Sequence, residues 1–87
     1  NDSLSSKLHI YPNPFTNSTI IEFDNDEEDM YELIVYDIIG SKVRIIDGIS
    51  TNMVVLEKGN LNPGVYLLEL RSDSRSIFGK VSLIFFE

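Results

Sequence analysis

The sequence predicts an all-β fold, a seven-stranded antiparallel β-sandwich. Seven short segments alternate apolar and polar residues or are rich in β-branched and aromatic residues, as strands are. Turn-forming residues separate these segments at intervals of about eight to twelve residues, and no segment has the periodicity of an amphipathic helix. A small closed barrel is the alternative that the same pattern leaves open. The predicted strands cover residues 8–10, 18–23, 31–37, 42–47, 52–57, 65–70 and 77–86.

The first predicted strand leads into a corner that contains two prolines. Apolar residues flank His9 on both sides, so we expect its imidazole to face outwards from the strand. Pro12 and Pro14 fix their own φ angles and hold the residues before them in extended conformations. The segment YPNPF is therefore predicted to be a rigid, extended corner before the second strand.

The second and third predicted strands are joined by an acidic stretch. Residues 18–23 alternate with a period of two and stop at DNDEED, whose carboxylates cannot lie inside a sheet. We therefore expect a solvated loop at residues 24–29. In the third strand, Tyr31, Leu33 and Val35 share the face that is expected to point into the core.

Glycine and proline residues mark the later turns. Gly40 indicates the tight turn of a hairpin between the third and fourth strands, and Asp47 with Gly48 is expected to end the fourth. The cluster at residues 59–64 supplies the turn before the sixth strand. Tyr66 is predicted to point into the core from that strand.

The last predicted strand has a core face and an outer face. The residues expected on the core face are Val81, Leu83 and Phe85. Lys80 faces away from the core. Ile84 and Phe86 leave apolar side chains on the outer face, where a partner or a linker is expected to cover them.

Composition limits the chain to one small domain and disfavours several classes of partner. The 87 residues are 43% hydrophobic and include no cysteine, so one core must hold without disulfides. Seven basic residues against fourteen acidic ones give a net charge of -7, which disfavours nucleic acids and membrane surfaces. No apolar run is long enough for membrane insertion. We assign residues 1–6 to the end of a linker and residues 7–87 to the domain.

No group of residues has the chemistry of an active site, and no cofactor is expected. His9 is the only histidine, and it stands in a strand without the nucleophile and acid of a triad. The acidic stretch 24–29 could offer carboxylate oxygens to Ca²⁺, but it lacks the glycine and the distal glutamate of an EF-hand loop. We interpret it as a solvated loop rather than a calcium site, a choice that calorimetric titration with Ca²⁺ tests.

Three blocks of sequence carry a resemblance to a known family. They are YPNPF at 11–15 with TIIEF after it, YDIIGSKV at 36–43, and LNPGVYLLEL at 61–70 followed by GKVSLIFFE. In this order they resemble the C-terminal sorting domain (type A) of proteins exported by the type IX secretion system. The resemblance spans about Leu8 to Glu87, although the last three residues replace the aliphatic and basic tail that is expected in the family.

The resemblance implies an immunoglobulin-like sandwich, fused behind a cargo protein, that the outer-membrane translocon recognises. It also implies a sorting peptidase that removes the domain, transit through the periplasm, and a final place at the cell surface or outside the cell. The family's motifs fall here on Pro12, Asn13, Pro14, Tyr36, Asp37, Gly40, Gly64, Tyr66 and Lys80. The candidate recognition residues are Pro12, Asn13, Pro14, Gly40, Gly64, Tyr66, Lys80, Ile84, Phe86 and Glu87.

Two other interpretations stay open. An adhesion or carbohydrate-binding module would share the fold class, but such modules usually present a row of exposed aromatic rings. This sequence has no tryptophan, and its inward tyrosines leave chiefly Tyr11 and Tyr36 for that purpose. A homodimer through the last strand could accompany a sorting function, because an exposed strand edge invites pairing with another chain.

Overall fold

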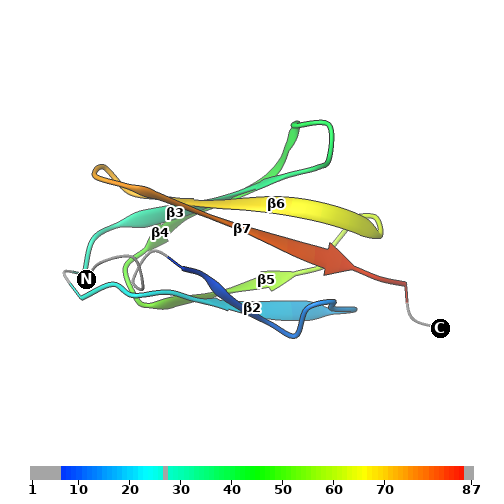
Figure 1. Ribbon diagram of the computed structural model, residues 1–87, viewed down its shortest axis with the longest axis horizontal. Coiled ribbons are helices and arrows are strands. Elements are labelled where there is room, and N and C mark those ends of the chain that lie inside the picture. The colour runs from blue at the N-terminus through cyan, green and yellow to red at the C-terminus, as the bar shows by residue number, and fades with distance from the viewer. Residues whose placement is uncertain (1–6, 27, 86–87) are drawn as a thin grey trace.

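Two antiparallel sheets stack on each other and form a β-sandwich (Figure 1). The computed structural model describes residues 7–26 and 28–85. The strands are β1 (His9–Tyr11), β2 (Ser18–Glu22), β3 (Tyr31–Tyr36), β4 (Lys42–Ile49), β5 (Met53–Glu57), β6 (Gly64–Arg71) and β7 (Ser76–Leu83). One sheet has the order β1-β2-β5 and the other has the order β4-β3-β6-β7. The prediction of a seven-stranded sandwich is confirmed, and the two sheets do not form a closed barrel.

The core lies between the two sheets and is filled by alternate residues of the strands. Leu33 on β3 and Leu68 on β6 are fully buried, as the sequence predicts. Ile21 and Leu56 meet them from the smaller sheet and are also fully buried. Burying a large apolar side chain contributes about 1.5–3 kcal/mol, so these residues are the main source of stability in a chain without disulfides. Within the described residues, no helix is long and apolar enough to cross a membrane.

The fourth strand is longer than its sequence indicates. The prediction that Asp47 and Gly48 end this strand is wrong, because β4 continues to Ile49. Gly48 has a φ angle of 72°, which only glycine adopts easily, and the pairing of β4 with β3 shifts register between Tyr31 and Leu33. A bulge therefore carries the strand through a residue that looks like a turn in the sequence.

The last strand ends earlier than predicted, at Leu83. Val81 and Leu83 point into the core as expected, but Phe85 does not, because its side chain is 70% exposed. The physical reason lies in the partner strand: Leu83 pairs with Gly64, the first residue of β6, and Pro63 before it has no N–H to extend the pairing. Beyond Leu83 the chain has no strand on β6 to follow. Phe86 lies outside the described residues.

Leu8 and Ile10 close the side of the core that lies next to β7. Both side chains are partly buried and pack against the core cluster. A Cβ atom added to Gly79 would lie 3.0 Å from the Cδ1 atoms of both residues. Glycine at this position therefore lets the first segment of the chain approach β7 closely.

Replacing Leu68 with alanine should lower the free energy of unfolding by about 2–5 kcal/mol, because the change leaves a cavity among fully buried side chains. Leu67 is the matched control, since its side chain is 44% exposed on the opposite face of β6. Leu67→Ala should cost about 1 kcal/mol or less. Urea unfolding of both variants, followed by circular dichroism, measures the two losses. Equal losses would contradict the assignment of the two faces of β6.

Candidate functional site

Most of the candidate recognition residues lie at one end of the sandwich. This end holds the β1–β2 connection, the β3–β4 hairpin, the β5–β6 connection and the end of β7, at the right of Figure 1. We call it the corner end and define it by residues 12–17, 37–41, 58–63 and 84–85. Its candidate residues are Pro12, Asn13, Pro14, Gly40 and Ile84, with Gly64 and Tyr66 at the adjoining start of β6. Glu87, like Phe86, lies outside the described residues.

Asn13 joins the corner to the edge of β7. Its side-chain amide donates a hydrogen bond to the carbonyl of Lys80 (3.1 Å), and its side-chain oxygen accepts one from the amide of Ser82 (3.0 Å). Phe15 continues the pairing through its backbone: its amide donates to the Ser82 carbonyl and its carbonyl accepts from the Ile84 amide, both at 2.9 Å. The corner therefore acts as a short extra strand along the end of β7.

The base of the corner is held from the smaller sheet. The hydroxyl of Thr19 is buried and donates to the carbonyl of Pro12 at 2.8 Å. The peptide bonds before Pro12 and Pro14 are both cis. The side chain of Phe15 is 1% exposed and belongs to the core cluster. The corner thus has hydrogen bonds to both sheets and an aromatic anchor between them.

This arrangement bears on the predicted homodimer through the last strand. Between Lys80 and Ile84, the outward backbone groups of β7 already bond to Asn13 and Phe15. A second copy could pair with this stretch only by displacing the corner. The homodimer stays a prediction. Because residues 80–84 are already paired with the corner, a second copy would have to pair with the earlier part of β7.

The β3–β4 hairpin presents two isoleucines at its tip. The carboxylate of Asp37 accepts hydrogen bonds from the amides of Ile39 (3.1 Å) and Ser41 (2.9 Å), and the Gly40 amide donates to the Asp37 carbonyl. Gly40 has a φ angle of 93°, as the predicted tight turn requires. Ile38 and Ile39 are 80% and 82% exposed on this well-bonded turn. Neither side chain was predicted from the sequence to be a recognition residue.

The β5–β6 connection is fixed by a tyrosine and an arginine. The hydroxyl of Tyr66 donates to the carbonyl of Asn62, four residues earlier, while its ring is buried as predicted. This resembles the tyrosine corner of immunoglobulin-like sandwiches. Arg44 on β4 donates to the carbonyls of Glu57 and Lys58, so the edge of the larger sheet also holds this connection. Gly64 has a φ angle of 157°, close to extended backbone.

A hydrogen-bonded carboxylate lies on the outer face of the larger sheet. Glu69 on β6 is only 9% exposed and accepts hydrogen bonds from the hydroxyls of Tyr36 (2.8 Å) and Ser76 (3.0 Å). The bond from Tyr36 is the main cause that lowers the pKa of Glu69, with help from Ser76 and the nearby positive charges of Arg71 and Lys42. The same bond raises the pKa of the Tyr36 hydroxyl.

Glu69 could not be recognised as a site residue from the sequence, because its hydrogen-bond partners depend on the pairing register of the strands. Glu69 pairs with Ile34 on β3 and with Phe78 on β7, and its hydrogen-bond partners Tyr36 and Ser76 are the diagonal neighbours two residues along those strands. The available signal was an acid at an outward position of a strand whose other outward positions include Val65 and Leu67. Lys80 is exposed on the same outer face, opposite Leu67.

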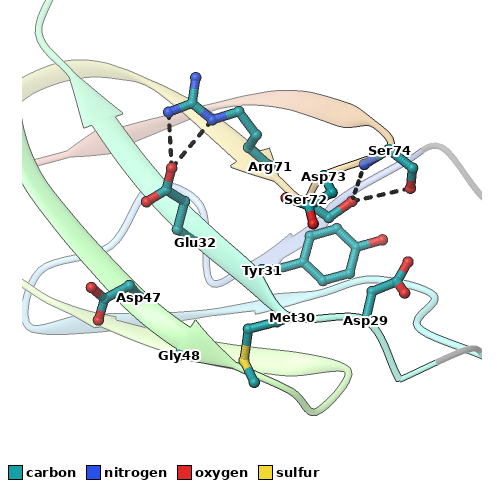
Figure 2. Close-up of a pocket in the computed structure, with 10 residues that line it drawn as sticks. All are labelled: Asp29, Met30, Tyr31, Glu32, Asp47, Gly48, Arg71, Ser72, Asp73 and Ser74. Atoms are coloured by element: carbon teal, nitrogen blue, oxygen red, sulfur yellow. Dashed lines mark hydrogen bonds and ion pairs between the residues drawn. The ribbon is translucent and has the colours of Figure 1, made fainter.

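The opposite end of the sandwich is acidic. A depression of about 560 Å³ lies there, and its lining includes Asp29, Glu32, Asp47, Asp73 and Arg71. Figure 2 shows Glu32 turned to the Arg71 guanidinium, with Asp29 and Asp47 on opposite sides of the depression. Among the residues with described positions, no three His, Cys, Asp or Glu side chains are grouped as metal ligands would be. The calcium alternative for residues 24–29 stays open to titration.

His9 is exposed on β1, as predicted.

Arg75 fixes the β6–β7 turn against the acidic loop, since it donates to the Tyr31 hydroxyl and to the Asp24 carbonyl, both at 2.8 Å. The ring of Tyr31 packs edge to face on Phe23, with 5.1 Å between centroids. Arg75 and Tyr31 therefore stabilise this end of the fold through these contacts.

Asn13→Ala should lower the free energy of unfolding by about 1–2 kcal/mol, because it removes two hydrogen bonds and leaves backbone groups of β7 without partners. Hydrogen exchange of the Ser82 amide should become faster in the same variant. Asn17→Ala is the control, since Asn17 is an exposed residue of the same connection. Exchange of Ser82 at the wild-type rate in Asn13→Ala would contradict the role of this side chain.

The lowered pKa of Glu69 predicts a pH dependence of stability. The ionised carboxylate stabilises the fold above its ordinary pKa of 4.5, and this contribution is lost as the pH falls through the lowered folded-state pKa. Glu69→Gln and Tyr36→Phe should therefore lose less stability than the wild type between about pH 6 and pH 3. Urea unfolding at both pH values measures this. Unchanged pH dependence in both variants would contradict the assignment.

Comparison with known proteins assigns the family. A search of curated proteins finds no significant match. The family model described as "Secretion system C-terminal sorting domain" matches residues 9–83, from the first residue of β1 to the last residue of β7. The match includes the corner, the β3–β4 hairpin and the β5–β6 connection. A sorting tail of this kind implies export to the cell surface or the extracellular space. The chain therefore belongs to the C-terminal sorting domains of the type IX secretion system.

Proposed function

We propose that this domain directs a fused cargo protein through the type IX translocon and across the outer membrane. The family match over residues 9–83 supports this proposal. The observation that carries it is the gathering of Pro12, Asn13, Gly40 and Gly64 at and beside the corner end, although they are distant in sequence. In this proposal one binding partner contacts these segments together.

The arrangement of the strands fits an appended signal. Lys7 and the start of β1 lie away from the corner end, because His9 pairs with Glu22 at the far end of β2. A cargo that precedes the domain would leave the corner end free for the translocon. In this proposal the domain spans residues 7–87, residues 1–6 are the end of a linker, and a sorting peptidase cuts before the domain after transit from the periplasm.

The alternative, an adhesion or carbohydrate-binding module, has less support in the positions of the aromatic side chains. The rings of Tyr11 and Phe78 are exposed, but they lie on different sheets. Tyr36 is half-buried and its hydroxyl is bonded to Glu69. These rings do not form the single flat row on which sugar rings usually stack.

A periplasmic reporter fused to residues 1–87 should appear outside a bacterium that has the system. The same reporter should stay in the periplasm when the translocon is deleted. The fraction of reporter activity in the medium, the cell surface and the periplasm measures the outcome. Retention in the periplasm of both strains would contradict the sorting function, and binding on a glycan array without any effect on export would favour the alternative.

A further inference from the structure

Several apolar side chains are exposed to solvent on the outer face of the four-stranded sheet. Val65 and Leu67 on β6 are 42% and 44% exposed, and Phe78 on β7 is 57% exposed. A depression of about 490 Å³ runs over them, from Ile38 of the hairpin to Lys80 of β7. We call this depression the sheet groove. It has the apolar floor and the few polar groups that are typical of binding surfaces.

The acidic side chains near the sheet groove are already bound within the fold, whereas two lysines lie beside it. Glu32 and Glu69 interact with Arg71, at 2.8 Å and 4.0 Å, and Asp37 is occupied by the turn of the hairpin. Lys80 borders the sheet groove. Lys42 pairs with Tyr36 on β3, and its positive charge lies close enough to Glu69 to help lower the pKa of that carboxyl group.

Lys42 and Lys80 form no ion pair with any residue that the structure describes. Around the sheet groove, Asp37, Glu69 and Glu32 are matched in number by Lys42, Lys80 and Arg71, while Asp47 of β4 lies at the far end of the same face and the whole chain carries a net charge of -7. The two acids that line the groove, Asp37 and Glu69, accept hydrogen bonds within the fold, and the two lysines are available to a partner. The complementary partner is therefore apolar with a flanking carboxylate.

We propose that the sheet groove receives an apolar segment of a protein partner, and that an acidic group beside this segment pairs with Lys80 and Lys42. The inference rests on the proposed function, in which the partner is a component of the outer-membrane translocon. The exposed Ile38 at the end of the groove adds an apolar contact on a turn that Asp37 holds in place. Apolar side chains at the centre of a protein interface usually dominate its affinity, and in the sheet groove these are Val65, Leu67 and Phe78.

A membrane is a poorer occupant of the sheet groove. Burial against hydrocarbon would remove water from Glu69 and Lys80, which a protein partner can compensate with hydrogen bonds. A second copy of this chain is also a poorer occupant, because two chains of net charge -7 repel each other. Both occupants remain outcomes of the test.

The test compares two valines that are equally exposed on the two sheets. Val65 lines the sheet groove at 42% exposure, and Val55 on β5 is 43% exposed on the other sheet. In the reporter fusion, Val65→Asp should lower the exported fraction about tenfold. Val55→Asp should export like the wild type, which controls for the added charge. Thermal unfolding confirms that both variants fold.

A second pair of variants tests the partner's acidic group. Lys42→Glu and Lys80→Glu should each reduce export severalfold through repulsion of the partner's carboxylate. Lys7→Glu is the control, since Lys7 is exposed outside the groove. Normal export of both the Lys42→Glu and the Lys80→Glu variant would overturn the proposal that the partner carries an acidic group.

The outcomes separate this inference from the function on which it rests. A wild-type fusion that stays in the periplasm refutes the proposed function. A wild-type fusion that is exported equally well with Val65→Asp refutes the sheet groove alone. Light scattering that shows a wild-type dimer, absent in Val65→Asp, would overturn the translocon partner in favour of a second copy. Flotation of the wild type, but not of Val65→Asp, with vesicles of neutral phospholipid would overturn it in favour of a membrane.

Discussion

The hydrogen bonds between Asn13 and the edge of β7 connect the beginning of the chain to its last strand. The two sheets of a sandwich are otherwise held mainly by side chains, which fix the distance between the layers but specify their relative position less strictly. Asn13 bonds to the backbone at Lys80 and Ser82, while Thr19 holds the same corner from the smaller sheet. The connection between residues 12–13 of the corner and β7 therefore ties the two sheets together at this end.

Much of the fold could be predicted because strands and turns have local signatures. The alternation in residues 31–36 predicts the inward faces of Tyr31 and Leu33, which are buried. Gly40 predicts the hairpin turn, where its positive φ angle is found. The errors occurred where pairing decides the outcome. Gly48 looks like a turn but lies in a bulge, and Phe85 continues the pattern of β7 but has no partner strand beside it.

The candidate site was less predictable than the fold. Asn13 could be named from the family resemblance, but its bonds to residues 67 and 69 positions later follow only from the tertiary structure. Glu69 stands within the block LNPGVYLLEL, but the sequence assigned it no role, because its hydrogen bonds come from Tyr36 and Ser76 on two other strands. A sequence pattern can place each residue on a face. It does not show which side chains of different strands become neighbours, and the hydrogen bonds of Asn13 and Glu69 depend on that.

The corner also has a consequence for the order of events during synthesis. Residues 80–84 leave the ribosome long after residues 12–15, and contacts across so many residues form late and slowly. Until β7 is complete, the corner lacks its backbone partners and Phe15 lacks the neighbouring Leu83. The assembled corner end therefore exists only on a chain whose last strand has been made.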